Sequence, residues 1–329
     1  MKQIYLFTIL GLIFAVALAA MMLFPKQEKF SPIWEIRSVD TVKYSRDNSW
    51  EMLNKPEYDE IIDKQVADIA GLGVSHIAIA TPYDEQFVPY LKRWVEKARK
   101  HKLKVWFRGN FSGWEKWFNY EKISREEHKK LLEQFIVNNP NLFEDGDIFT
   151  SCPECENGGP GDPRFTTDVS GHRQFLIEEY QISQNSFQQI NKKVIPGYYS
   201  MNYDVAKLIM DNKTTQALGG IVAIDHYVAD PKKLLEDSKQ IAQTSGGRVV
   251  LGEFGAPIPD INGAMNEAQQ AQWINEAFEE IKKAPEIVGV NYWVNIGGST
   301  KLWDEDGKRR QAADVVRNFF TLTKPISPR

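Results

Sequence analysis

Two glutamates stand directly after apolar runs of the sequence, where buried strands are expected to end. Glu253 follows Val-Val-Leu-Gly at 249–252, and Glu154 follows the run at 147–151. Because a charge at the end of a buried strand costs free energy unless it is paired or used, these carboxylates are candidates for chemistry. Two carboxyl groups can act on one substrate as acid and base. Taken alone, Glu253 could equally cap a loop or pair with an arginine.

The elements that would position these residues alternate along the chain. Short apolar runs predict buried strands, and segments with apolar residues every three to four positions predict helices between them. Glycine pairs and prolines fall at the expected boundaries of the helices. We predict strands at 34–44, 75–80, 104–107, 147–151, 194–199, 221–224, 249–251 and 287–292. We predict helices at 56–70, 87–101, 124–138, 168–191, 204–211, 231–244, 266–283 and 312–321.

This alternation predicts an α/β fold, a single (β/α)8 TIM barrel. Strands that alternate with helices form parallel sheets, and eight is the number at which such a sheet closes. A doubly wound open sheet is the competitor, but the first strand is followed by Tyr-Ser-Arg-Asp at 44–47 rather than by a Gly-rich phosphate turn. The barrel brings the ends of strands four and seven to one mouth, where Glu154 and Glu253 could face each other.

Four short motifs carry a more specific resemblance. They are Leu-Gly-Glu-Phe-Gly at 251–255, Asp-His-Tyr at 225–227, Tyr-Trp at 292–293 and Leu-Trp-Asp-Glu-Asp-Gly-Lys at 302–308. With them the chain resembles the GH-A-like clan of barrel glycoside hydrolases, which carry the acid/base on strand four and the nucleophile on strand seven. The resemblance spans 34–320 and identifies no family within the clan.

The resemblance implies roles for named residues. Glu253 would be the nucleophile and Glu154 the acid/base. The clan usually has asparagine before the acid/base, and here Pro153 stands there, so Glu156, which is followed by Asn157, is an alternative acid/base. Structural roles, such as a salt bridge or core packing, stay open for the residues around them. The expected substrate-binding residues are Arg108, Asn110, Asn157, His226, Tyr227 and Trp293.

The function expected from these residues is retaining hydrolysis of O-glycosidic bonds, β-linked, in a poly- or oligosaccharide. Retention requires the two carboxyl groups to lie about 5 Å apart. The reaction needs no cofactor and no metal. Two alternatives remain: a membrane-tethered barrel that binds carbohydrate without catalysis, and a thiol-redox protein that uses Cys152 and Cys155. The second is disfavoured because the Gly/Pro-rich segment after Cys155 cannot open a helix.

The net charge and the amino-terminal sequence indicate which partners the protein has and where in or outside the cell it is located. A net charge of −4 provides no basic surface for nucleic acid. Residues 4–24 carry no charge and are long enough to span a bilayer, so we predict a signal-anchor or signal peptide at 1–24. A tether at 25–33, a catalytic domain at 34–322 and a tail at 323–329 would follow. The expected protein is an exported monomer, anchored with its globular part extracytoplasmic, or secreted if cleavage follows Ala-Leu-Ala at 17–19.

Overall fold

The computed structural model describes residues 30–325, which divide into two compact units. The larger unit is Trp34–Thr321. In the other unit, the short strands β1 (Phe30–Pro32) and β11 (Thr323–Pro325) pair antiparallel. The predicted hydrophobic helix at 4–24 lies outside the described residues. No helix among residues 30–325 is long and apolar enough to cross a membrane.

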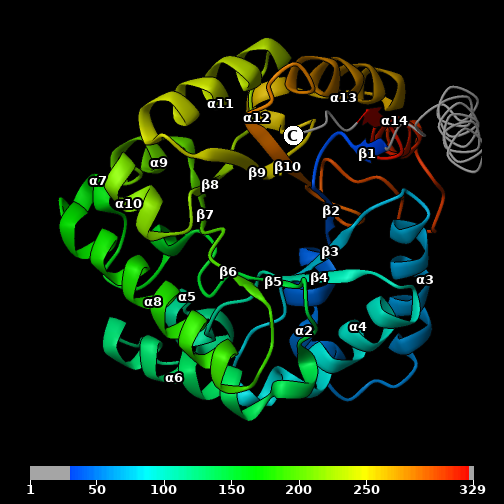
Figure 1. Ribbon diagram of the computed structural model, residues 1–329. Coiled ribbons are helices and arrows are strands. Elements are labelled where there is room, and N and C mark those ends of the chain that lie inside the picture. The colour runs from blue at the N-terminus through cyan, green and yellow to red at the C-terminus, as the bar shows by residue number, and fades with distance from the viewer. Residues whose placement is uncertain (1–29, 326–329) are drawn as a thin grey trace, which may run out of the picture. The chain divides into compact units, whose positions relative to one another are not determined.

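The larger unit is built on a curled parallel sheet, and the strands follow the predicted alternation (Figure 1). Within the larger unit, the last strand, β10, pairs in parallel with the first, β2. The sheet therefore curls into a barrel-like arrangement, as predicted. Along the sheet the order is β6-β5-β4-β3-β2-β10-β9-β8-β7. The strands are β2 (Ile36–Asp40), β3 (His76–Ile79), β4 (Lys104–Phe107), β5 (Ile148–Phe149), β6 (Ile195–Pro196), β7 (Ser200–Asn202), β8 (Ile221–Asp225), β9 (Arg248–Phe254) and β10 (Ile287–Tyr292).

The two edge strands of this sheet, β6 and β7, are consecutive in the chain and replace the single predicted strand at 194–199. Gly197 and Tyr198 between them both have positive φ, at 102° and 55°, which breaks an extended backbone. Thus β5 pairs with β6, and β7 pairs with β8. The covalent connection through Gly197 and Tyr198 spans the place where the ladder of hydrogen bonds is interrupted.

Helices lie around the outside of the strands (Figure 1). Their apolar faces cover the sheet, as expected where both faces of a parallel sheet are buried. The longer helices are α3 (Tyr58–Ala70), α4 (Val88–Lys100), α6 (Arg125–Asn138), α8 (Val169–Gln189), α11 (Pro231–Ser245), α13 (Glu267–Ile281) and α14 (Gln311–Phe320). Shorter helices are α2 (Ser49–Met52), α5 (Ser112–Glu115), α7 (Pro163–Thr166), α9 (Tyr203–Ile209), α10 (Asn212–Ala217) and α12 (Pro259–Asn262).

Single turns of helix occur in the connections. They are η1 (Lys43–Asp47), η2 (Glu85–Phe87), η3 (Trp117–Asn119), η4 (Pro140–Leu142) and η5 (Cys155–Asn157). The first of them corrects a prediction, because we expected extended chain to residue 44. The carbonyl of Thr41 instead accepts hydrogen bonds from the backbone N–H groups of Tyr44 and Ser45, which turns the chain.

Apolar side chains from seven of the strands form one buried cluster. Residues two apart on a strand share a face, so the cluster defines the inward side of each strand. Trp106 belongs to it, and Arg108, two residues further, therefore points inward above it. The cluster consists of Ile36, Ala78, Trp106, Ile148, Ile221, Ala223, Val250 and Val288.

Candidate active site

A cavity of about 250 Å³ opens at the carboxyl ends of the strands. Both predicted catalytic residues, Glu154 and Glu253, line it, together with Arg108 and Asn157. Trp117 adds an aromatic side chain to the same wall. We call this cavity the cleft.

Glu253 reaches the cleft because β9 contains a bulge. Val250 faces inward, so strict alternation would turn Gly252 inward and Glu253 outward. The pairing of β9 shifts register here against both neighbours, β8 and β10, and the extra residue re-aims the side chain that follows. Gly252 itself must be glycine, since an added Cβ would lie 2.5 Å from Asp225 Oδ1 and 2.7 Å from Ser200 Cβ.

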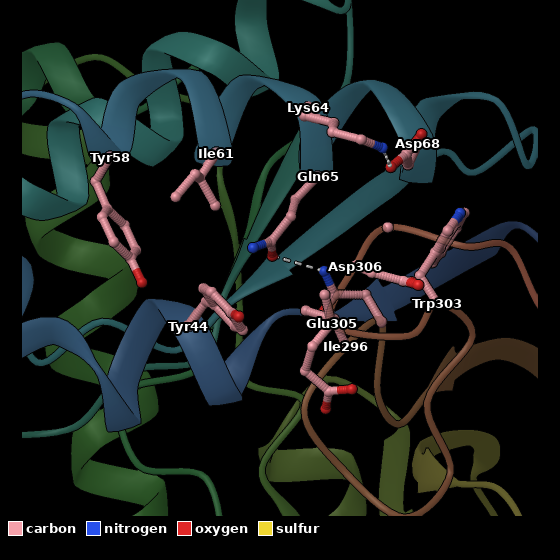
Figure 2. A pocket seen from close by; sticks show the side chains of 12 residues that line it. Tyr44, Tyr58, Ile61, Lys64, Gln65, Asp68, Ile296, Trp303, Glu305 and Asp306 are labelled. Atoms are coloured by element: carbon pink, nitrogen blue, oxygen red, sulfur yellow. Dashed lines mark hydrogen bonds and ion pairs between the residues drawn. The ribbon is translucent and has the colours of Figure 1, made fainter.

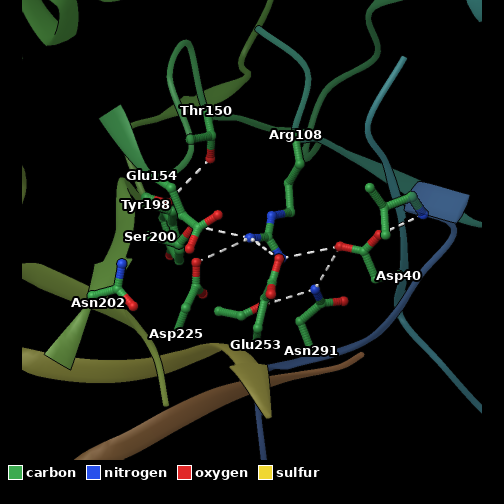
Figure 3. Close-up of polar contacts among 12 residues, drawn as sticks. Asp40, Arg108, Thr150, Glu154, Tyr198, Ser200, Asn202, Asp225, Glu253 and Asn291 are labelled. Atoms are coloured by element: carbon green, nitrogen blue, oxygen red, sulfur yellow. Dashed lines mark hydrogen bonds and ion pairs between the residues drawn. The ribbon is translucent and has the colours of Figure 1, made fainter. Parts of the chain in front are cut away.

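Two donors hold the Glu253 carboxyl group. Arg108 Nη2 donates to Oε1 at 3.1 Å (Figure 3). The Tyr227 hydroxyl donates to Oε2 at 2.8 Å. Burial raises the pKa of Glu253 to about 7, and the nearby charge of Glu154 adds to this, whereas Arg108 and Tyr227 favour the ionised form. Arg108 and Tyr227, which we expected to bind substrate, thus contact the carboxyl group of Glu253 directly.

Arg108 is the centre of a buried polar network (Figure 3). Its side chain is 3% exposed, and it bonds Asp40 Oδ2 at 3.1 Å, the Gly252 carbonyl oxygen at 2.5 Å and Ser200 Oγ at 2.9 Å. Burial alone would lower the pKa of Arg108, but the carboxyl groups of Asp225, Glu253 and Asp40 outweigh it and raise that pKa. The guanidinium is therefore a fixed positive charge beneath the cleft.

Glu154 stands on the loop after β5 in a left-handed conformation, with φ 46° and ψ 48°. Such a conformation is uncommon for a residue other than glycine, and it must be held by its surroundings. The Glu154 backbone N–H donates to the Ser200 carbonyl at 2.7 Å. A disulfide joins Cys152 to Cys155 on either side of Glu154. Both sulfur-bearing residues are buried, so the disulfide braces the loop that presents this carboxyl group.

Within the part of the chain that the structure describes, the Glu154 side chain has one hydrogen bond, which Asn157 Nδ2 donates to Oε2 at 3.1 Å. Burial raises the pKa of Glu154 above its ordinary value, and the charge of Glu156 raises it further. Arg108 and Arg46 act in the opposite direction from a distance. Glu154 thus lacks the direct cation contact that Glu253 has, which favours a proton on Glu154.

Glu156 does not line the cleft. Its Oε1 accepts from the Asn202 backbone N–H at 2.8 Å and from Asn202 Nδ2 at 3.1 Å, and its side chain is buried. Burial raises the pKa of Glu156, whereas the hydrogen bonds from Asn202 lower it. This residue therefore ties the β5 loop to the end of β7.

Two of the predicted substrate-binding side chains are engaged with other protein groups. Asn110 is fully buried and donates to Glu115 Oε1 at 2.7 Å. His226 Nε2 pairs with Asp237 Oδ2 at 2.7 Å, and its ring stacks on Tyr203. A third, Trp293, is partly exposed, packs against the cleft residues Val42 and Ala80 and meets Tyr227 edge-on.

Sequence reasoning missed several residues of the site. Asp40 ends β2 and lines the cleft, but the predicted first strand ran on to residue 44 and concealed it. Asp225 ends β8 beneath the cleft, 3.6 Å from Arg108 Nη2. Polar residues at strand ends were the available signal for both. Arg46 lines the cleft from η1, and its guanidinium lies 4.9 Å from the centre of the Trp117 ring.

Glu115 is a fourth carboxyl group in the cleft, besides those of Asp40, Glu154 and Glu253, and lies on a short helix that no sequence periodicity predicts. Burial raises the pKa of Glu115 to about 8, which favours its protonated form, although the hydrogen bond from Asn110 acts in the opposite direction. Asn110 Oδ1 in turn contacts His128 Nε2 at 2.9 Å, and His128 Nδ1 contacts Glu179 at 3.1 Å. Within residues 30–325, no group of three or more His, Cys, Asp or Glu side chains is arranged to hold a metal ion.

Comparisons with known proteins show which solved structures have a fold similar to that of this chain. No family model and no curated protein sequence matches the chain. Among solved structures, GH5_18 from Streptomyces cattleya in complex with GlcNAc aligns with a TM-score of 0.67 and 14% identity, over 91% of this chain and 83% of that one. GH5_18 from Bifidobacterium longum subsp. infantis aligns with a TM-score of 0.62 and 14% identity, over 87% and 78%.

A further neighbour is beta-glycosidase BGL167, with a TM-score of 0.58 and 12% identity, over 93% of this chain and 100% of that one. These neighbours are glycoside hydrolases of the GH-A clan, as the resemblance in the sequence implied. At such low identity the likeness concerns the fold, and the chain therefore shares the barrel fold of GH-A clan glycoside hydrolases.

Proposed function

We propose that this protein hydrolyses O-glycosidic bonds, β-linked, with retention of configuration. One observation carries the proposal: the two expected catalytic carboxyl groups line one cleft and have different partners. Glu253 accepts hydrogen bonds from the Arg108 cation and from Tyr227, whereas among residues 30–325 the Glu154 side chain accepts one only from the amide of Asn157. Retaining hydrolysis needs this asymmetry, because the nucleophile must be ionised while the acid carries a proton.

In the first step the Glu253 carboxylate attacks the anomeric carbon. The bond from that carbon to the leaving oxygen breaks, and Glu154 gives its proton to the leaving oxygen. In the second step Glu154 takes a proton from water, which attacks the anomeric carbon and releases Glu253. Arg108 stays charged throughout and stabilises the carboxylate that is consumed and regenerated.

Glu154 is the better acid/base than Glu156. Glu154 lines the cleft that Glu253 also lines, whereas the Glu156 side chain is buried and its Oε1 is held by Asn202. The position of Glu154 also argues against a barrel that only binds carbohydrate. Binding alone does not require two carboxyl groups of which one is bonded to a cation and the other to a neutral amide. The neighbours named above, a beta-glycosidase and a protein in complex with GlcNAc, support sugar as the substrate class.

The proposal is tested by substitutions assayed on a panel of aryl β-glycosides. Glu253→Gln should remove hydrolysis of every aryl glycoside that the wild type cleaves. Glu154→Ala should lower hydrolysis by about 10²–10⁴-fold, the usual contribution of an acid/base. Added azide should restore turnover in Glu154→Ala and yield a β-glycosyl azide, because azide needs no proton removed.

Glu156→Gln is the matched control and should keep most of the activity, with no response to azide. The proposal fails if Glu253→Gln retains wild-type activity. Proton NMR of the first product is the stereochemical check, and an α-product from a β-glycoside would also contradict it.

A further inference from the structure

A second cavity, of about 190 Å³, lies between α3 and the loop that follows β10 (Figure 2). It is separate from the cleft, although both touch the turn η1. Tyr44 of that turn lines the second cavity, and Arg46, two residues further, lines the cleft. We call the second cavity the α3 pocket. The reaction proposed above makes no use of it.

Two buried amides in the α3 pocket have unused hydrogen-bonding atoms. Asn295 Nδ2 donates to Gln65 Oε1 at 2.8 Å, while Gln65 Nε2 and Asn295 Oδ1 have no partner among the described residues. Gln65 is 7% exposed and Asn295 is 1% exposed. If both amides were turned over, one donor and one acceptor would still remain. Because a buried polar atom without a hydrogen-bond partner destabilises the structure, an occupant that supplies both partners is favoured.

The direction of the Gln65 side chain supports an occupant in the α3 pocket. Its side chain extends from α3 toward the space between Tyr58 and Tyr44 (Figure 2). The two tyrosine rings stack with centroids 6.3 Å apart, and Ile61, Ile296 and Trp303 complete the apolar lining. The pocket therefore combines flat apolar surface with convergent polar atoms, the usual composition of a small-molecule site.

The charges of the α3 pocket are mostly neutralised in place. Lys64 pairs with Asp68 at 2.6 Å, and Glu305 pairs with Lys301 at 2.7 Å. Asp306 Oδ1 accepts from the Lys308 backbone N–H at 2.9 Å. An anionic ligand would meet no unpaired positive charge here, because Lys64 is paired with Asp68. Asp306 has no cation partner among the described residues, but it is exposed, so water screens its charge. The pocket is therefore suited to a neutral polar molecule.

We propose that the α3 pocket binds one neutral sugar unit of a glycan, outside the cleft. Each sugar hydroxyl both donates and accepts a hydrogen bond, so neighbouring hydroxyls can satisfy Gln65 and Asn295 together. The apolar C–H face of a sugar ring can pack on the tyrosine rings. The cavity is smaller than the roughly 300–1,000 Å³ of a drug-sized site, so it admits a single ring. This inference does not depend on the proposed hydrolysis.

The test measures the binding of named sugars to the full chain by ligand-observed NMR. The probes are the methyl β-glycosides of glucose, mannose, xylose and N-acetylglucosamine. At least one probe should bind, and Tyr58→Ala and Gln65→Leu should each weaken that binding by about tenfold or more, since a tenfold loss corresponds to about 1.4 kcal/mol. Tyr58→Phe keeps the ring and should keep the binding.

Glu60→Ala, an exposed substitution on α3 outside the pocket lining, is the matched control and should change nothing. Trp117→Ala alters only the cleft and should leave this binding intact. The proposal is overturned if no probe binds, or if binding persists in Tyr58→Ala and disappears in Trp117→Ala. Glu253→Gln separates the two proposals, because it should abolish hydrolysis and retain the sugar bound in the α3 pocket.

Discussion

At the scale of single residues, the chemistry depends on what each carboxyl group contacts. Glu253, Glu154 and Glu115 share one cleft, and burial raises the pKa of all three. Only Glu253 is bonded to a guanidinium and a phenol, while the other two accept from neutral amides. Similar side chains are thereby given different protonation states, which is what acid and nucleophile require.

The contribution of Tyr227 can be measured through pH dependence. Its hydrogen bond lowers the pKa of Glu253, so Tyr227→Phe should raise that pKa above its value of about 7. Since the nucleophile must be ionised, the rise of kcat/KM with pH should move to higher pH in this variant. Tyr203→Phe is the control, because Tyr203 stacks on His226 and does not contact Glu253. An unmoved profile in Tyr227→Phe would show that the hydroxyl does not act on the nucleophile.

At the scale of elements, the site depends on local irregularities that position side chains. The bulge in β9 turns Glu253 inward, and the disulfide-braced loop after β5 presents Glu154. The break between β6 and β7 is a further case, since Ser200 after the break bonds both Arg108 and the Glu154 backbone. Each irregularity places a polar group that a regular strand would have placed elsewhere.

Gly252→Ala tests the bulge. A Cβ at this position would clash with Asp225 Oδ1 and Ser200, so we expect destabilisation of about 1–3 kcal/mol and displacement of Glu253. Hydrolysis should fall further than the loss of folded protein explains, which thermal melting and activity per folded molecule would separate. Gly71→Ala, at the end of α3 with φ −62°, is the control and should change neither the melting temperature nor the activity per folded molecule. Full activity in Gly252→Ala would contradict the assigned role of the bulge.

At the scale of the whole molecule, the alternation of elements was predictable because parallel strands buried on both faces are continuous apolar runs. The expected ends of strands pointed to Arg108, Glu154 and Glu253, which line one cleft, and to Tyr227, which contacts Glu253. The break at Gly197 and Tyr198 was not predictable, since positive φ at a tyrosine follows from tertiary contacts. Asn110 and His226 do not line the cleft, for a related reason. Residues adjacent to strand ends can turn away from the mouth, and only packing decides which do.

The signal-anchor or signal peptide at 1–24 stays a prediction. If residues 4–24 form an uncleaved anchor, the full chain should sediment with membranes and resist extraction by alkaline carbonate. A variant without residues 2–24 should be soluble and keep the same kcat/KM on an aryl glycoside. Mass spectrometry of the mature chain decides between the two forms, since a new amino terminus after Ala19 would indicate a signal peptide instead.

The central claim is that Glu253 becomes bonded to the sugar during turnover. The most direct measurement is trapping with a 2-deoxy-2-fluoro β-glycoside carrying a good leaving group, followed by peptide mass spectrometry. The account predicts one sugar per chain, attached to the peptide that contains Glu253, and no label in Glu253→Gln. A label on any other residue, or cleavage of the reagent with inversion and without a label, would contradict it.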